Sequence, residues 1–119
     1  MRSDRIYKMT FSSVYPHYVN KILRKERSVE DLDELLMWLT GYSEAELEAL
    51  KTSEKTFLEL FDEAPLLNPK VSEITGMICG YRIEEIEDPL MKKMRYMDKI
   101  VDELGNGRPM YKIKREAKP

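Results

Sequence analysis

The segment DPLMKKMRYMDKIVDEL, from Asp88 to Leu104, decides the fold that the sequence predicts. Apolar side chains recur in it at alternating steps of four and three, at Leu90, Met94, Met97, Val101 and Leu104. This spacing places them along one stripe of an α-helix, as in a coiled-coil seam. Asp88 is a favourable N-cap and Pro89 a favourable first helical residue, whereas glycines follow Leu104. We therefore predict a long amphipathic helix from about Pro89 to Leu104.

The residues just before this helix carry a dense set of ionisable groups. Gly80 favours a left-handed helix end, so a preceding helix with Val71, Ile74 and Ile78 on its buried face is expected to finish there. The connection to Asp88 then presents a thiol, a phenol, a guanidinium and three carboxylates. The predicted binding patch consists of Cys79, Tyr81, Arg82, Glu84, Glu85 and Glu87, with His17 as a further member.

Helix signals also occur along the first half of the chain. Tyr15 begins a run of apolar residues at helical spacing, which Ser12 or Ser13 would cap, and Ser28 would cap a second helix that ends at Gly41. Ser43 and Glu46 form a capping box for a third helix. A fourth carries Phe57, Leu60 and Phe61, and Asn68-Pro69 starts the fifth.

These signals predict an all-α, compact single domain of five to seven helices over residues 1–119. Residues 1–11 are predicted to form a lead-in segment or a short extended arm. The segment after Gly107 allows one more helical turn. It also forms a basic tail over residues 108–119, and such terminal charge runs are usually solvated.

The composition restricts the functional classes. The chain has 119 residues, 42% of them hydrophobic and 35% charged, which fits one globular domain. Its net charge of -2 provides no general attraction to nucleic acid or membranes. We expect no signal peptide, because Met1 to Arg5 leads into no long apolar run, and no membrane span. A single cysteine suits a reducing cytoplasm.

Three features of the sequence allow either a specific chemical function or an ordinary structural role. The helices around Gly41 outline a helix-turn-helix, but Glu44, Glu46 and Glu48 would repel phosphates, so specific nucleic-acid binding is not expected. His17 and Cys79 would form a nucleophilic pair only if the fold brought them together. The acidic turn, formed by Glu84, Glu85, Glu87 and Asp88, offers oxygen ligands for magnesium or calcium. Helix capping and the helix dipole already explain these acids, so we predict no metal site.

The methionines of the last helix leave two interpretations open. They fill the protein's own core, or they form a dimer interface if the seam is only partly covered within the chain. The candidate interface consists of Leu90, Met94, Met97, Val101 and Leu104.

Several segments resemble one uncharacterised bacterial family, DUF2200, a domain of unknown function. They are RIYKMTF (5–11), SVYP (13–16), WLTGY (38–42), CGYR (79–82), EEIEDPLM (84–91) and MDK (97–99). The resemblance implies one domain over nearly the whole chain in the bacterial cytoplasm. It implies no activity, cofactor or catalytic residue.

The sequence thus predicts a small cytoplasmic interaction protein that self-associates through its last long helix, a homo-oligomer that also leaves room for an unknown protein partner. The alternative is a small-molecule or cation-binding protein, with an enzyme included, whose site lies near Tyr81, Arg82 and the acidic turn. A non-enzymatic role is favoured, and no cofactor is predicted.

Overall fold

The protein is built around α6 (Pro89–Gly105), the long helix that the seam predicts. The computed structural model describes residues 4–117. In chain order the other elements are α1 (Asp4–Lys8), α2 (Phe11–Arg24), α3 (Val29–Thr40), α4 (Glu44–Lys51), α5 (Phe57–Glu63), the 3-10 helix η1 (Pro69–Glu73), β1 (Met77–Ile78), β2 (Tyr81–Arg82), the 3-10 helix η2 (Ile83–Glu85) and α7 (Met110–Ile113). The predicted all-α fold with seven α-helices over the described residues is confirmed.

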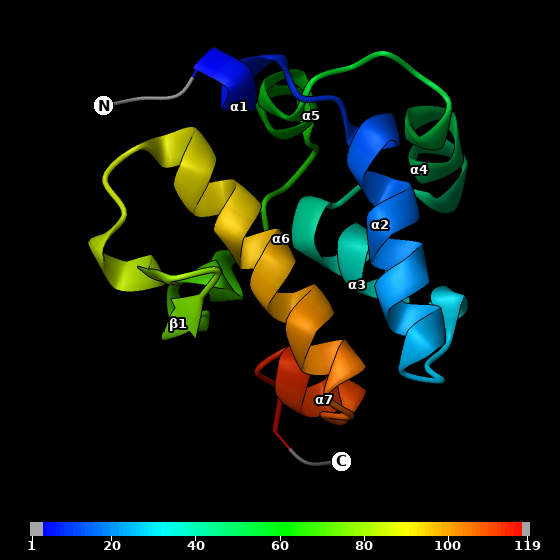
Figure 1. Ribbon diagram of the computed structural model, residues 1–119, viewed down its shortest axis with the longest axis vertical. Coiled ribbons are helices and arrows are strands. Elements are labelled where there is room, and N and C mark those ends of the chain that lie inside the picture. The colour runs from blue at the N-terminus through cyan, green and yellow to red at the C-terminus, as the bar shows by residue number, and fades with distance from the viewer. Residues whose placement is uncertain (1–3, 118–119) are drawn as a thin grey trace.

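The seam of α6 is covered by the chain's own helices. Figure 1 shows α6 crossing the molecule, and it packs against α2, α3, α5 and α7. Four of the five seam residues are at most 4% exposed, and Met94 is half-buried. Leu90, Met97, Val101 and Leu104 therefore belong to the core, and the expectation that they form a dimer interface loses its structural basis. The oligomeric state itself stays a prediction.

Local capping signals set most helix boundaries as predicted. The Ser28 hydroxyl accepts hydrogen bonds from the backbone at the start of α3, and Ser43 forms a complete capping box with Glu46 at the start of α4. Asp88 caps α6, with Pro89 as the first helical residue. Asp88 also accepts a hydrogen bond from the Tyr7 hydroxyl at 3.0 Å, which ties the N-terminal segment to α6.

The predicted fifth helix is wrong over its second half. Asn68 caps η1 as expected, but η1 ends at Glu73, and the chain then forms an antiparallel hairpin of β1 and β2. Cys79 and Gly80 make its two-residue turn with φ values of 51° and 82°. Two positive φ values in sequence match a type I′ hairpin turn, so the glycine marks a turn rather than a helix end.

From Asp4 onward the predicted N-terminal arm is mostly helical. Asp4–Lys8 form α1, and only a short stretch around Thr10 is extended, where it makes a single antiparallel bridge with Thr56. Phe11 is fully buried as the first residue of α2. The arm therefore packs on α5 as part of the domain.

Within the described residues, the C-terminal tail is docked at Lys114 and Arg115, whereas Arg108 and Lys112 are exposed, as expected of a solvated tail. Arg115 donates hydrogen bonds to both carboxylate oxygens of Glu103, and the two side chains are only 13% and 9% exposed. Lys114 pairs with Glu34 on α3, and Lys70 donates to the Arg115 carbonyl at 2.7 Å. Lys70, Lys114 and Arg115 thus pair with other parts of the chain.

Gly41 provides a sharp test of this packing. It ends α3 with φ +80°, and a Cβ there would lie 2.8 Å from the backbone nitrogen of Leu66. Gly80 has nearly the same φ, +82°, but open space around it. We expect Gly80→Ala to destabilise by about 1 kcal/mol through left-handed strain, and Gly41→Ala by about 1 kcal/mol more through overpacking. Chemical denaturation measures both; equal losses would contradict the close approach to Leu66.

Within residues 4–117, the structure contains no helix that is both long enough and apolar enough to span a membrane.

Candidate functional site

The tip of the β1–β2 hairpin exposes large apolar side chains. Met77 is 51% exposed and Tyr81 is 43% exposed, and the Cys79 thiol between them is also exposed. The hairpin is attached to α6, because Lys99 donates a hydrogen bond to the Met77 carbonyl at 3.1 Å. Met77 pairs with Arg82 and Ile78 with Tyr81, so the Met77 and Tyr81 side chains project from opposite sides of the two strands. The exposed residues of this hairpin, Met77, Cys79 and Tyr81, together with Arg95 beside the Tyr81 ring, are collectively called the hairpin face below.

Arg95 links the hairpin to the helices. Its guanidinium carbon lies 5.0 Å from the centre of the Tyr81 ring, within cation–π range. Its Nη1 donates to Asp98 at 2.7 Å, and Asp98 accepts a second hydrogen bond from the Tyr18 hydroxyl at 2.6 Å. The result is a continuous chain of contacts from β2 through α6 to α2.

In this series of contacts, the Tyr18 phenol stays neutral beside the charged pair of Arg95 and Asp98. Burial raises the pKa of Tyr18 well above its usual value, and the neighbouring carboxylate of Asp98 raises it further. In the part of the chain that the structure describes, the Nε of Arg95 is the one buried side-chain polar atom without a hydrogen-bond partner. Such groups are uncommon in native proteins because desolvation without a partner destabilises them.

The acidic turn is largely engaged in local contacts. Glu84 accepts a hydrogen bond from the Gly76 backbone at 2.7 Å, which lowers the pKa of its carboxyl group. Arg82 lies 4.0 Å from Glu84 and 3.5 Å from Glu85. Glu87 is exposed at the end of the turn. Over residues 4–117 no group of three or more His, Cys, Asp or Glu side chains is arranged to hold a metal ion.

His17 lies on the exposed side of α2. It lines a broad, open hollow with Asn20, Leu23 and Arg24. Its neighbour Tyr18 points instead to Asp98, so the structure connects α2 to the hairpin face through Tyr18.

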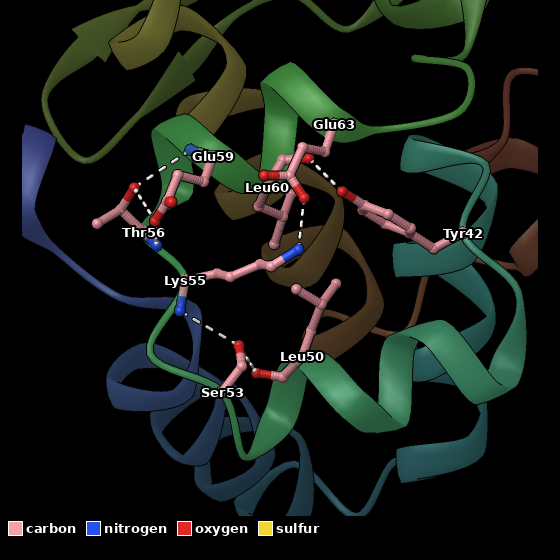
Figure 2. A network of polar contacts seen from close by, with 8 residues as sticks. All are labelled: Tyr42, Leu50, Ser53, Lys55, Thr56, Glu59, Leu60 and Glu63. Atoms are coloured by element: carbon pink, nitrogen blue, oxygen red, sulfur yellow. Dashed lines mark hydrogen bonds and ion pairs between the residues drawn. The ribbon is translucent and has the colours of Figure 1, made fainter.

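A second concave region, the α4–α5 cleft, has a volume of about 240 Å³. It is lined by Tyr42, Glu46, Ala49, Leu50, Ser53, Lys55 and Glu63. Figure 2 shows Lys55 reaching from the loop between the helices to an ion pair with Glu63, while the Tyr42 hydroxyl donates to the Leu60 carbonyl at 2.6 Å. No sequence motif marks this cleft, because its residues come from three separate segments of the chain.

Two residues of the hairpin face, Cys79 and Tyr81, could be predicted from the sequence. The exposed Met77 was not predicted, nor were the supporting residues Arg95, Asp98 and Tyr18. Arg95 and Asp98 are of opposite charge and three residues apart, a spacing that faces them together on a helix. That signal was present in the sequence; the contact with Tyr18 was not, because it joins residues 80 apart.

The structure places Cys79 in a hairpin turn, whereas the predicted helix would have placed it in the last helical turn. The residue is exposed in a hairpin turn, so a small thiol reagent near neutral pH has direct access to it. We expect native protein to be labelled about as fast as protein unfolded in urea. Mass spectrometry of timed aliquots measures this, and protection of more than about tenfold in the native state would contradict the exposed turn.

Because Tyr15 and Tyr18 are buried phenols with raised pKa values, we expect the free energy of unfolding to fall at alkaline pH. Burial and a hydrogen bond to Asp33 raise the pKa of Tyr15 from 10.0 to about 12, and Tyr18 shifts in the same direction. Because the folded protein holds these protons more tightly, their contribution is complete below pH 10 and is lost as the pH rises toward about 12. Urea unfolding at pH 9 and pH 11 measures the loss. Tyr15→Phe should show a smaller loss than wild type, and an equal loss would refute the assignment.

Known proteins share both the sequence pattern and the fold of this chain. The fold and site define a small helical protein with a hairpin braced against its central helix. Residues 5–115 match the family described as "Uncharacterized protein conserved in bacteria (DUF2200)", and the chain belongs to that family. The crystal structure of the uncharacterised protein SP1917 is similar at 37% identity with a TM-score of 0.88, over 98% of each chain. No curated protein matches the chain.

Proposed function

We propose that the protein is a non-enzymatic interaction protein of the bacterial cytoplasm, and that its partner binds at the hairpin face. The observation that carries the proposal is the exposure of Met77 and Tyr81, at 51% and 43%, on a hairpin that Lys99 of α6 contacts at the Met77 carbonyl. Tyrosine, methionine and arginine are the residue types enriched at the centres of protein interfaces.

The support beneath the tip favours this surface further. Arg95 is fixed by Asp98 and by the Tyr81 ring, although its Nε then lacks a partner. An unpaired, exposed Cys79 suits a reducing compartment. The alternative of a cation or small-molecule site at the acidic turn has less support, because Glu84 and Arg82 already bind neighbouring groups.

Capture from a lysate of the native bacterium tests the proposal. Wild type, the double variant Met77→Ser/Tyr81→Ser and the control Leu66→Ser are immobilised, and captured proteins are quantified by mass spectrometry. Leu66 is 65% exposed in the loop after α5, so it matches the hairpin residues in exposure but not in position. We expect a protein that wild type and the control capture and the double variant loses. Equal capture by all three would refute the hairpin face as the binding surface.

A second copy of the chain is the first partner to examine. Light scattering coupled to size exclusion at high micromolar concentration gives the mass of wild type and of the double variant. A dimer that becomes a monomer in the double variant would identify self-association at the hairpin face. A monomer in both would leave the partner to be found among the captured proteins.

A further inference from the structure

We propose that the α4–α5 cleft binds the ammonium group of a small organic amine, in the position that the Lys55 side chain occupies in the unliganded protein. This site is separate from the hairpin face and does not depend on the interaction proposed there. The inference rests on the shape of the cleft, the charges that face it and the identity of the group now seated in it.

The cleft has room for a small ligand with a short alkyl chain. Its volume of about 240 Å³ equals that of about eight water molecules in the liquid, at about 30 Å³ each. Leu50 and Ala49 supply an apolar wall along α4, while the mouth carries hydroxyl and carboxylate groups. An apolar wall with a few convergent polar groups is typical of small-molecule sites.

The charges that face the cleft select a cation. Burial raises the pKa of the Tyr42 phenol, and the carboxylates of Glu63 and Glu46 raise it further, so both acids act on the same hydroxyl. Glu63 is also the last residue of α5, where backbone carbonyls lack partners within the helix. Lys55 is the one cation among the residues that line the cleft, against these two acids. An anionic ligand would therefore be repelled once Lys55 is displaced.

Lys55 shows that the cleft accepts an ammonium group. Its side chain crosses from the loop to Glu63, and this ion pair raises the pKa of Lys55. The paired side chains are 47% and 49% exposed, so the pair is solvated and contributes little to stability. The Lys55 backbone is held independently by a hydrogen bond to the Ser53 hydroxyl at 3.2 Å. The side chain can therefore swing into water without moving the loop.

A ligand ammonium would take over the same contacts. It has three donors, and Glu63 accepts one of them as it now does from Lys55. The Tyr42 oxygen has free lone pairs, because its hydroxyl donates to the Leu60 carbonyl. Removing Lys55 should thus strengthen amine binding, whereas removing the Glu63 charge should weaken it.

Titration with 1,4-diaminobutane tests the proposal, followed by the amide NMR signals of Ser53, Lys55 and Glu63. The neutral analogue 1,4-butanediol, with ionic strength matched by NaCl, controls for the alkyl chain. We expect Lys55→Met to bind the diamine about tenfold more tightly than wild type and Glu63→Gln about tenfold more weakly. Lys114→Met removes a comparable lysine, paired with Glu34 outside the cleft, and should leave the affinity unchanged.

Three outcomes would overturn the proposal, provided that each variant keeps the dispersed spectrum of the folded protein. They are equal shifts with the diol and the diamine, no gain in affinity for Lys55→Met, and shifts confined to residues outside the cleft. None of them bears on the hairpin face, since capture by that surface is measured with variants of Met77 and Tyr81.

Discussion

Replacing Glu103 with alanine is expected to lower the free energy of unfolding by about 3–5 kcal/mol. Both oxygens of its carboxylate accept hydrogen bonds from the Arg115 guanidinium, and the two side chains are 9% and 13% exposed. Removing the carboxylate leaves a buried guanidinium with its main partner gone, and the desolvation of that charge is then uncompensated. Arg115 further holds the tail to η1 through the Glu73 carbonyl, at 3.3 Å.

Urea denaturation of matched variants measures this loss. Glu34→Ala is the control, because its partner Lys114 also belongs to the tail but Glu34 is 52% exposed. Exposed pairs of this kind contribute less than about 1 kcal/mol. Replacing both Glu103 and Arg115 with leucine should recover much of the stability, because no buried charge is left unpaired. A Glu103→Ala loss no larger than that of Glu34→Ala would show that the tail is solvated after all.

The capping residues could be predicted from the sequence because their interactions are local. Ser43 and Glu46 bond to each other's backbone within a single turn, and Asp88 bonds to the two residues that follow Pro89. Such contacts depend on a few consecutive residues and on little else. For the same reason the long helix was predicted with nearly the right limits.

The incorrect predictions came from sequence patterns that are compatible with two different structures. Gly80 has a positive φ both at the end of a helix and in a type I′ turn, and only the partner strand distinguishes them. The seam of α6 has the spacing of a coiled coil, whether it packs on the same chain or on a second copy. Here Met97 and Val101 pack within the chain. The choice depends on contacts between distant residues, which the spacing does not contain.

The hairpin face was half predictable for a related reason. Turn chemistry and exposed polarity marked Cys79 and Tyr81. The residues that hold them, Arg95 and Asp98, lie on another element and were assigned only to a helix. The docking of Arg115 could not be predicted for the same reason. A run of basic residues does not show that one of them pairs with a buried carboxylate 12 residues away.

The strongest test of the N-terminal packing is Phe11→Ala, which we expect to destabilise by about 3–5 kcal/mol. Phe11 is fully buried, with its ring centre 5.4 Å from that of Tyr15 and 5.9 Å from that of Phe57. Truncation to alanine removes these contacts and leaves a cavity that rigid neighbours fill only in part. The backbone adds to the attachment, because the Phe11 N–H donates to the Lys55 carbonyl at 3.2 Å.

The size of this loss distinguishes an arm from a core element. If residues 1–11 were a lead-in that merely touches the domain, Phe11→Ala would change stability by no more than about 0.5 kcal/mol, as most surface substitutions do. Phe11→Leu is the matched control, because it keeps an apolar side chain in place and should destabilise by less than about 1.5 kcal/mol. A large loss for alanine and a small one for leucine would place Phe11 in the core that joins α2 to α5. Small losses for both would instead detach the first eleven residues from the folding unit.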